Sequence, residues 1–365
     1  NGSQLKFIAS TSNLREFVAF NPSATFVTPE FVSNVENQNL HAIGEPDMVI
    51  VTYDAFEAPS NELASFHQSE TGISVKVVKL SKIYNEFGGG KPDISAIRDF
   101  MRMLYDRAGN DTAIMPRYLL LMGDGSFDPK NRVADNQEFV PCYESYESES
   151  ETASFTSDDF YALLDVNEGG NIAVNGQDMD LAVGRLPIAS EQEAWDVVNK
   201  IKKYKHPSNA ASCVQINNNN SWRNNVTFVA DDQDNDTHLD ASNYLADITR
   251  NQHPEYNYDK IFLDAYKQVT TPSGDRYPEV NTAIINKINS GTLILNWVGH
   301  GGETNWAHER IFNMTEIAQL SNKEKLPLFI TATCEFSRYD IPERTAGEYL
   351  ITNANGGAIA SITTV

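Results

Sequence analysis

Apolar runs that fit buried strands alternate with amphipathic stretches along most of the chain. The clearest strand patterns are bounded by Gly, Pro or polar turn residues and lie at 47–52, 117–122, 226–230, 291–298 and 326–333. Between them, apolar side chains recur at helical spacing, as in 93–108 and 191–204. Alternating strands and helices predict an α/β fold with mainly parallel sheets and right-handed crossovers.

Shorter apolar runs extend this pattern. Those at 74–80 and 260–263 predict further strands, and 158–164 and 181–187 have the pattern of hairpin or edge strands. The segment 143–157 is rich in Glu and Ser, and this composition predicts a solvated loop.

A polar break divides the pattern into two halves. It opens at Pro207, runs to Asn225 and includes four consecutive asparagines, which suits a linker or an exposed loop. We therefore predict two adjacent α/β subdomains, the first at 41–206 and the second at 207–365.

The two ends of the sequence carry further expectations. Residues 1–40 contain short extended pieces between turn residues, which we interpret as the tail of a preceding β-rich region. Because residues 357–365 are strand-like up to the last position, we expect a fragment truncated before a further domain.

Composition excludes several classes of protein. The chain has 50 acidic and 28 basic residues and a formal charge of -22, which argues against a nucleic-acid partner. No apolar run reaches the roughly 18 residues of a membrane span. The three cysteines, Cys142, Cys213 and Cys334, leave at least one free thiol, with a Cys142–Cys213 disulfide as an alternative for the other two.

Two of the strand patterns end on chemically reactive residues. The run 291–298 leads into Gly299 and His300, and the run 326–333 leads into Cys334. Ligands bind beyond the carboxyl ends of parallel strands, so we expect these side chains to lie side by side at a site. An imidazole beside a thiol can serve as its base, which makes Cys334 a candidate nucleophile. The alternative is that Cys334 is a buried small hydrophobic residue.

Two loops allow a ligand-binding interpretation. Gly-Asp-Gly-Ser at 123–126 could cradle a phosphate, but it lacks the lysine of a P-loop, which favours a tight loop at a strand end. The acidic run 231–236 favours a solvated loop, with calcium held by Asp231, Asp234 and Asp236 as the alternative. We expect no required cofactor, with calcium as a candidate structural ion.

At the two reactive strand ends the sequence closely resembles the catalytic segments of gingipain-type cysteine peptidases. The matching stretches are Asn-Trp-Val-Gly-His-Gly-Gly-Glu-Thr-Asn-Trp at 296–306 and Leu-Pro-Leu-Phe-Ile-Thr-Ala-Thr-Cys at 326–334. Segments 118–128 and 182–187 extend the likeness, which covers nearly everything after about residue 36. Within the family, 228–232 and 333–338 are most similar to the sortase of the type IX secretion system.

The resemblance implies a caspase-like (caspase-hemoglobinase) fold and a set of catalytic roles. Cys334 would be the nucleophile and His300 the general base, with the backbone amides of Gly301 and Cys334 binding the oxyanion. The acid that orients the histidine would be Asp232, with Asp231 as the alternative.

The family likeness also makes predictions about the substrate. The acidic residue that selects basic P1 side chains falls near Thr237 or His238, neither of which would pair with arginine. We therefore expect poor cleavage after Arg or Lys, with Thr237, His238 and Glu335 as the candidate substrate-binding residues.

The sortase likeness implies an activity, partners and a location. The enzyme would cleave C-terminal sorting domains from secreted cargo through an acyl-enzyme on Cys334. It would then transfer the cargo to an amine of anionic lipopolysaccharide, or to water, at the bacterial outer-membrane surface, held there by an outer-membrane partner. The alternatives are a gingipain-like degradative cysteine protease and a non-catalytic, calcium-dependent binding module.

Overall fold

A computed structural model describes residues 6–10, 12, 15–26, 28, 30–31, 33–147, 150, 153–173, 176–206 and 220–365. The chain divides into two units, Asn1–Gln38 and Asn39–Val365. The described residues of the first unit form no helix or strand. The expectation of a preceding β-rich region stays a prediction.

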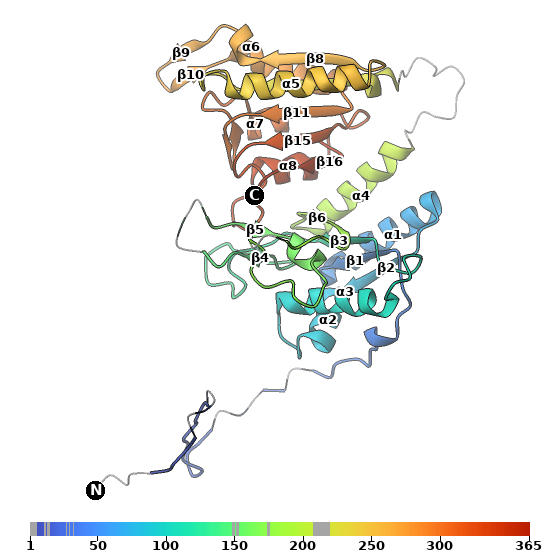
Figure 1. Ribbon diagram of the computed structural model, residues 1–365, viewed down its shortest axis with the longest axis vertical. Helices are drawn as coiled ribbons and strands as arrows, with labels where there is room; N and C mark the ends of the chain where they lie inside the picture. Colours follow the sequence, from blue (N-terminus) through green and yellow to red (C-terminus); the bar gives the residue numbers. More distant parts are fainter. Residues whose placement is uncertain are drawn as a thin grey trace. The chain divides into compact units, whose positions relative to one another are not determined.

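The amino-terminal half of the second unit is built on a four-stranded parallel sheet (Figure 1). Its strands, in the order β2-β1-β3-β6, are Val75–Lys79, Met48–Thr52, Tyr118–Met122 and Ala182–Leu186. Successive residues of β1 point to opposite faces. Val49 and Val51 pack with helices α2 (Leu80–Phe87) and α3 (Ile94–Ala108). Met48 and Ile50 pack with α1 (Glu57–Thr71) and α4 (Glu191–Lys205).

The carboxyl-terminal half contains a five-stranded parallel sheet (Figure 1). In the order β16-β15-β11-β7-β8, its strands are Ala360–Ile362, Leu328–Ala332, Ile294–Val298, Asn225–Ala230 and Asn257–Phe262. The helices of this half are α5 (Thr237–Gln252), α6 (Pro278–Ser290), α7 (Met314–Ala318) and α8 (Ala346–Thr352). Its core contains the stacked rings of Trp297 and Trp306, with centroids 5.1 Å apart.

Short elements complete the described fold. The small strands are β4 (Tyr143–Glu144), β5 (Thr156–Ser157), β9 (Val269–Thr271), β10 (Gly274–Arg276), β12 (Gly301–Gly302), β13 (Asn305–Trp306) and β14 (Phe312–Asn313). The 3-10 helices are η1 (Leu40–Ala42), η2 (Asp54–Phe56), η3 (Asp159–Ala162), η5 (Asn220–Asn224) and η6 (Leu263–Ala265). Among the helices that the structure describes, none is both long and apolar enough to cross a lipid bilayer.

The structure departs from the sequence expectations in three places. The segment 158–164 is not a strand, since residues 159–162 form η3, where Tyr161 is buried and its hydroxyl donates to the Pro141 carbonyl at 2.6 Å. Residues 80–87 form α2, which the sequence pattern had not indicated. The expected solvated loop at 143–157 contributes the short pair β4 and β5. The subdomain boundary at 206/207 stays a prediction.

Candidate active site

The site lies where the two central strands β11 and β15 end. These strands pair in parallel, with Val298 opposite Ala332. His300 and Cys334 each follow two residues later, so the backbone brings them to the same edge of the sheet. The Gly299 N–H donates to the Ala332 carbonyl at 3.2 Å, which carries the pairing one residue beyond the strands.

The loop after the neighbouring strand β7 is tied to the same edge. The Asp231 N–H donates to the Val298 carbonyl at 3.1 Å, and the His300 N–H donates to Asp231 Oδ2 at 2.8 Å. A Cβ at position 299 would lie 2.4 Å from Trp297 and 2.6 Å from the Asp231 Cβ. Only glycine therefore fits between the buried tryptophan and the aspartate that holds the His300 backbone.

Gly301 lies equally close to the other strand end. A Cβ at this position would lie 2.2 Å from Thr333 Oγ1, directly before the cysteine. Gly301 and Gly302 form β12, which pairs with β13 in a hairpin. The predicted oxyanion amides, those of Gly301 and Cys334, belong to these two facing segments, and their role stays a prediction.

The cysteines differ in environment. Cys334 is exposed, which is opposite to the buried small hydrophobic residue of the alternative interpretation. Cys142 is buried, and burial raises the pKa of its thiol well above the usual value. Both are free thiols, and the suggested partner of Cys142, Cys213, lies outside the described residues.

His300 is exposed and has two further histidines beside it. Its ring centroid lies 5.0 Å from that of His238, at an interplanar angle of 84°, and 5.4 Å from that of His308. The described residues show no hydrogen bond from the His300 ring to Cys334 or to an acidic side chain. Catalytic hydrogen bonds often tighten only when substrate binds, so this geometry is compatible with a base at His300.

Of the two candidate orienting acids, Asp231 contacts His300 and Asp232 does not. Besides the backbone contact, a carboxylate oxygen of Asp231 lies within 4.8 Å of a ring nitrogen of His300. The Asp232 carboxylate instead accepts the Tyr277 hydroxyl at 2.5 Å. The geometry thus favours Asp231, the alternative, for the orienting role.

A buried acid beside these aspartates was not found from the sequence. Oxygens of Glu309, Asp231 and Asp232 lie within 4.8 Å of one another, and all three residues are buried. Burial raises the pKa of Asp231 and of Glu309. Glu309 stands in a loop after a hairpin, and no spacing or motif in the sequence indicates that it reaches this site.

The predicted substrate-binding residues lie in two places. His238 is brought against His300, whereas the Thr237 hydroxyl turns back to donate to the Asp234 carbonyl at 2.8 Å. Glu335 is exposed and directly follows Cys334, with a positive φ of 51°. Left-handed backbone at a residue other than glycine is unusual and concentrates at functional sites.

The predicted calcium ligands do not form one cluster. The Asp234 carboxylate contacts His238 and is not grouped with Asp231, and Asp236 is exposed at the start of α5. Among the described residues, Asp231 groups instead with His238 and His300, or with Asp232 and Glu309. Calcium binding at the three aspartates stays a prediction that this arrangement does not favour.

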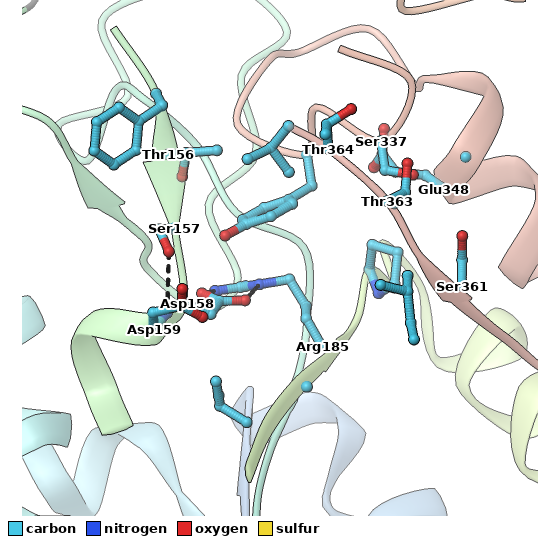
Figure 2. Close-up of a pocket in the computed structure, with 18 of the residues that line it drawn as sticks. Thr156, Ser157, Asp158, Asp159, Arg185, Ser337, Glu348, Ser361, Thr363 and Thr364 are labelled. Carbon is cyan, nitrogen blue, oxygen red and sulfur yellow. Dashed lines mark hydrogen bonds and ion pairs between the residues drawn. The ribbon is translucent and has the colours of Figure 1, made fainter. Parts of the chain in front are cut away.

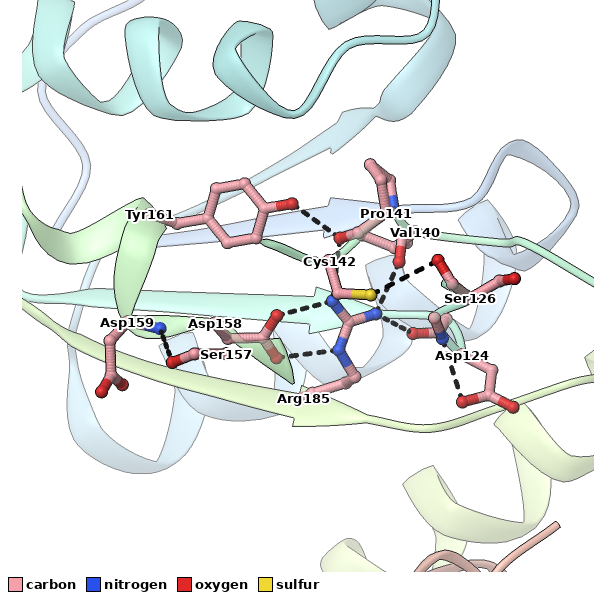
Figure 3. A network of polar contacts seen from close by, with 12 residues as sticks. Asp124, Ser126, Val140, Pro141, Cys142, Ser157, Asp158, Asp159, Tyr161 and Arg185 are labelled. Atoms are coloured by element: carbon pink, nitrogen blue, oxygen red, sulfur yellow. Dashed lines mark hydrogen bonds and ion pairs between the residues drawn. The ribbon is translucent and has the colours of Figure 1, made fainter. Parts of the chain in front are cut away.

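The loop after Cys334 docks on the first half of the unit. The Tyr339 ring covers the guanidinium of Arg185 at 4.7 Å, and the Phe127 N–H donates to the Asp340 carbonyl at 2.7 Å. Arg185 forms a bidentate ion pair with Asp158, at 2.7 and 2.8 Å, and donates to the carbonyls of residues 123, 140 and 141 (Figure 3).

The Gly-Asp-Gly-Ser segment at 123–126 lies beside the contact between Tyr339 and Arg185. The amides of Gly123 and Asp124 donate to the carbonyls of Leu186 and Ile188, which ties the segment to the end of β6. Gly125 allows the Tyr339 ring to approach, since a Cβ there would lie 3.0 Å from it.

A cavity of about 660 Å³ lies beside this contact and apart from the reactive pair. Its lining includes Asp158 and Arg185 from the first half and Ser337 and Thr363 from the second (Figure 2). Neither His300 nor Cys334 lines it. The cavity therefore belongs to the junction of the two halves and not to the candidate active site.

The chain matches a family of known peptidases. The sequence model of a protein family described as Peptidase family C25 matches residues 41–365. Gingipain R2 of Porphyromonas gingivalis is 23% identical over 246 residues, which cover 66% of this chain and 26% of that protein. This chain thus spans about a quarter of the length of that curated relative.

Solved structures also match the chain. The Arg-specific cysteine proteinase gingipain R superposes with a TM-score of 0.61 and 17% identity, covering 90% of this chain and 64% of that one. Dimeric latent PorU from Porphyromonas gingivalis matches 47% of this chain and 16% of its own, with 32% identity and a TM-score of 0.40. The likeness to gingipain R confirms the predicted caspase-like α/β fold with mainly parallel sheets.

Proposed function

Because the chain belongs to peptidase family C25, as the match over residues 41–365 shows, we propose that it is a cysteine endopeptidase. Cys334 is its nucleophile and His300 its general base. The observation that carries the proposal is the pairing of β11 with β15, which brings two exposed reactive side chains to one sheet edge.

The chemistry follows from the residues at this edge. The His300 imidazole takes the Cys334 thiol proton, and the thiolate attacks the peptide carbonyl to form a C–S bond. The amides of Gly301 and Cys334 stabilise the negative charge that develops on the carbonyl oxygen. The imidazolium then returns the proton to the leaving amine as the C–N bond breaks, which leaves a thioester on Cys334.

The fate of the thioester distinguishes a sortase from a hydrolase. In our proposal the chain is a sortase of the type IX secretion system that acts on cargo proteins with C-terminal sorting domains. An amine of anionic lipopolysaccharide attacks the thioester and releases the thiolate, with water as the competing acceptor. The proposal places the protein at the bacterial outer-membrane surface, where an outer-membrane partner holds it.

Sequence features support the sortase over a digestive protease. Segments 228–232 and 333–338 resemble those of the sortase. No acidic residue stands at positions 237 and 238, near which the resemblance to gingipains would put the acid that selects a basic side chain. The second candidate, a gingipain-like degradative protease, is favoured by the identity to Gingipain R2 over 66% of this chain.

The test uses the full chain, a purified cargo with its sorting domain, and an added primary amine. We expect cleavage at one junction, with a product whose mass includes the amine, and no product from Cys334→Ala. Retained processing by Cys334→Ala would refute the peptidase assignment. Cleavage at many sites with only water-derived products would refute the sortase and favour the degradative protease.

A further inference from the structure

Three potential metal ligands meet beside the candidate base. One donor atom from each of Asp231, His238 and His300 lies within 4.8 Å of the other two. They come from the end of β7, the first turn of α5 and the end of β11. Three separate elements therefore converge on one point at the edge of the second sheet.

The second histidine is already oriented by a carboxylate. Asp234 Oδ2 forms an ion-pair contact with His238 Nδ1 and also accepts the His238 backbone N–H at 2.9 Å. The side chains of Asp234 and His238 are 14% and 23% exposed, so the pair is largely shielded. A carboxylate on Nδ1 leaves Nε2 as the free nitrogen, as is usual for histidines that bind metals.

Asp231 keeps acceptor capacity for a cation. Its two oxygens accept the backbone N–H groups of His300, at 2.8 Å, and of Asp232, at 3.1 Å. Each carboxylate oxygen has a second lone pair. Asp231 is only 2% exposed, and no lysine or arginine of the described part of the chain forms an ion pair with it. A bound cation would compensate this buried charge.

We propose that Asp231, His238 and His300 form a binding site for a divalent transition-metal ion of the zinc type. Two imidazoles and one carboxylate, with coordination positions left open, suit zinc. Calcium and magnesium prefer sites built from oxygen alone. The neighbouring oxygen cluster has other partners, since Asp232 accepts Tyr277 and Glu309 accepts Gln268 at 3.2 Å.

A metal ion bound at this site would inhibit the proposed enzyme. A metal ion on the His300 ring takes the lone pair that would otherwise accept the Cys334 proton. The inhibition would be reversible, because a chelator restores the free imidazole. The metal site rests on the donor geometry alone, whereas its inhibitory effect rests on the proposed role of His300.

The test measures zinc binding apart from activity. The full chain with Cys334→Ala is freed of metal with EDTA and titrated with zinc by isothermal calorimetry, and circular dichroism checks the fold of each variant. We expect one zinc ion to bind per chain. The affinity for zinc should be about 10–100-fold lower in Asp234→Asn, and the loss in His238→Gln should be at least as large. The matched control is His308→Gln, because His308 is exposed near His300 but lies outside the donor set.

Two results would overturn the metal site. One is the absence of zinc binding, or binding that His238→Gln leaves unchanged. The other is binding that is lost in Glu309→Gln but kept in His238→Gln, which would place the ion among the carboxylates. Wild-type activity is then assayed with zinc and with EDTA. Activity that persists with zinc bound would overturn the inhibitory effect, whereas an enzyme inactive even in EDTA would count against the proposed function.

Discussion

His300 and Cys334 each stand two residues beyond a paired position of adjacent parallel strands, Val298 opposite Ala332. The sheet itself therefore sets the approach of the proposed base to the proposed nucleophile. Glycines at 299 and 301 let the two loops come together where a side chain would collide with Trp297, Asp231 or Thr333. Both reactive side chains remain exposed at this edge, where a polypeptide substrate can reach them.

The first prediction concerns thiol reactivity. A thiol reacts as its thiolate, whose fraction falls about tenfold for each unit by which the pKa rises. Cys334 is exposed, whereas burial raises the pKa of Cys142. We expect iodoacetamide to label Cys334 at least about tenfold faster than Cys142 in the folded chain, as measured by peptide mass spectrometry.

His300→Gln and a denatured sample are the controls for this labelling. The variant should slow labelling of Cys334 and leave Cys142 unchanged, and denaturation should make the two cysteines equally reactive. Equal, slow labelling of both in the folded chain would contradict an activated Cys334 and favour the non-catalytic binding module.

The second prediction concerns the approach of the two loops. A methyl group at position 301 would lie 2.2 Å from Thr333 Oγ1 and 3.2 Å from both Cβ and Cγ2 of Thr333. One rotation of the threonine brings Cγ2 to the place of Oγ1 and keeps the clash, and Thr333 Cβ stays 3.2 Å from the new methyl group in every rotamer. We expect Gly301→Ala to separate the loops and to lower kcat/KM by about 10–100-fold, since misplacement by about 1 Å has effects of this size.

Gly302→Ala is the matched control, because a Cβ at Gly302 meets nothing within 4 Å. Its kcat/KM should stay close to that of wild type. In Gly301→Ala, the further change Thr333→Ala should restore part of the activity. Equal losses in Gly301→Ala and Gly302→Ala would show that the close approach to Thr333 is not what matters.

The sequence was sufficient to predict the strands that carry the reactive pair. Apolar runs ending at Val298 and Thr333 predicted two central strands, and β11 and β15 occupy those positions. Parallel pairing then places His300 and Cys334 at the same edge of the sheet, because local patterns and sheet topology determine this relationship together.

Contacts that depend on docking between distant segments could not be predicted. Asp231 and Asp232 are adjacent residues just after β7, yet Asp231 accepts the His300 N–H whereas Asp232 accepts the Tyr277 hydroxyl. The Arg185–Tyr339 contact joins segments from the two halves, and no local pattern marks either residue as a partner. The prediction of a strand at 158–164 was wrong for a similar reason, since burial of Tyr161 in the core of the amino-terminal half favours a 3-10 turn.

The third prediction concerns substrate selectivity. The resemblance to gingipains implies that the acid which selects basic side chains would fall near Thr237 or His238, and His238 lies against His300. We expect ester substrates with Arg or Lys at P1 to be cleaved less efficiently than those with a neutral P1 residue, as measured by kcat/KM.

His238→Asp tests the cause of this selectivity. The new carboxylate should raise cleavage after Arg relative to a neutral residue by about 10-fold or more, because an ionic partner would then be available. Efficient hydrolysis of an Arg ester by the wild-type chain would disprove the prediction.

The fourth prediction concerns the junction of the two halves. Lys200 of α4 is 6% exposed, and its Nζ donates to the carbonyls of Ile351, Asn353 and Gly356 around the end of α8. Lys200→Met would leave these buried carbonyls without their donor. We expect the free energy of unfolding to fall by about 2–3 kcal/mol, as measured by urea denaturation.

Lys203→Met is the control on the same helix, because Lys203 is exposed. Its free energy of unfolding should remain within about 0.5 kcal/mol of wild type. An equally small effect of Lys200→Met would mean that water replaces the lysine at these carbonyls.

The last prediction concerns the pH dependence of stability. Glu348 is buried in the first turn of α8, where its Oε2 accepts the Thr345 N–H at 2.6 Å and the Thr345 hydroxyl at 2.7 Å. Burial is the main cause that raises the pKa of Glu348, and the negative charge of Asp124 raises it further. Burial also raises the pKa of Asp124. The folded chain therefore holds these protons more tightly than the unfolded chain does.

The sign of the effect follows from this difference. The protons on Glu348 and Asp124 stabilise the folded chain fully below the ordinary carboxyl pKa of about 4. This stabilisation is lost as the pH rises through the raised pKa values of the two groups, by up to about 1.4 kcal/mol per pH unit for each proton. Glu348→Gln keeps an acceptor for the helix cap but cannot ionise. Urea denaturation between about pH 5 and pH 8 should therefore show a smaller loss of stability in this variant than in wild type. The exposed Glu343→Gln should follow wild type, and a Glu348→Gln profile parallel to wild type would show that Glu348 is not the group that titrates.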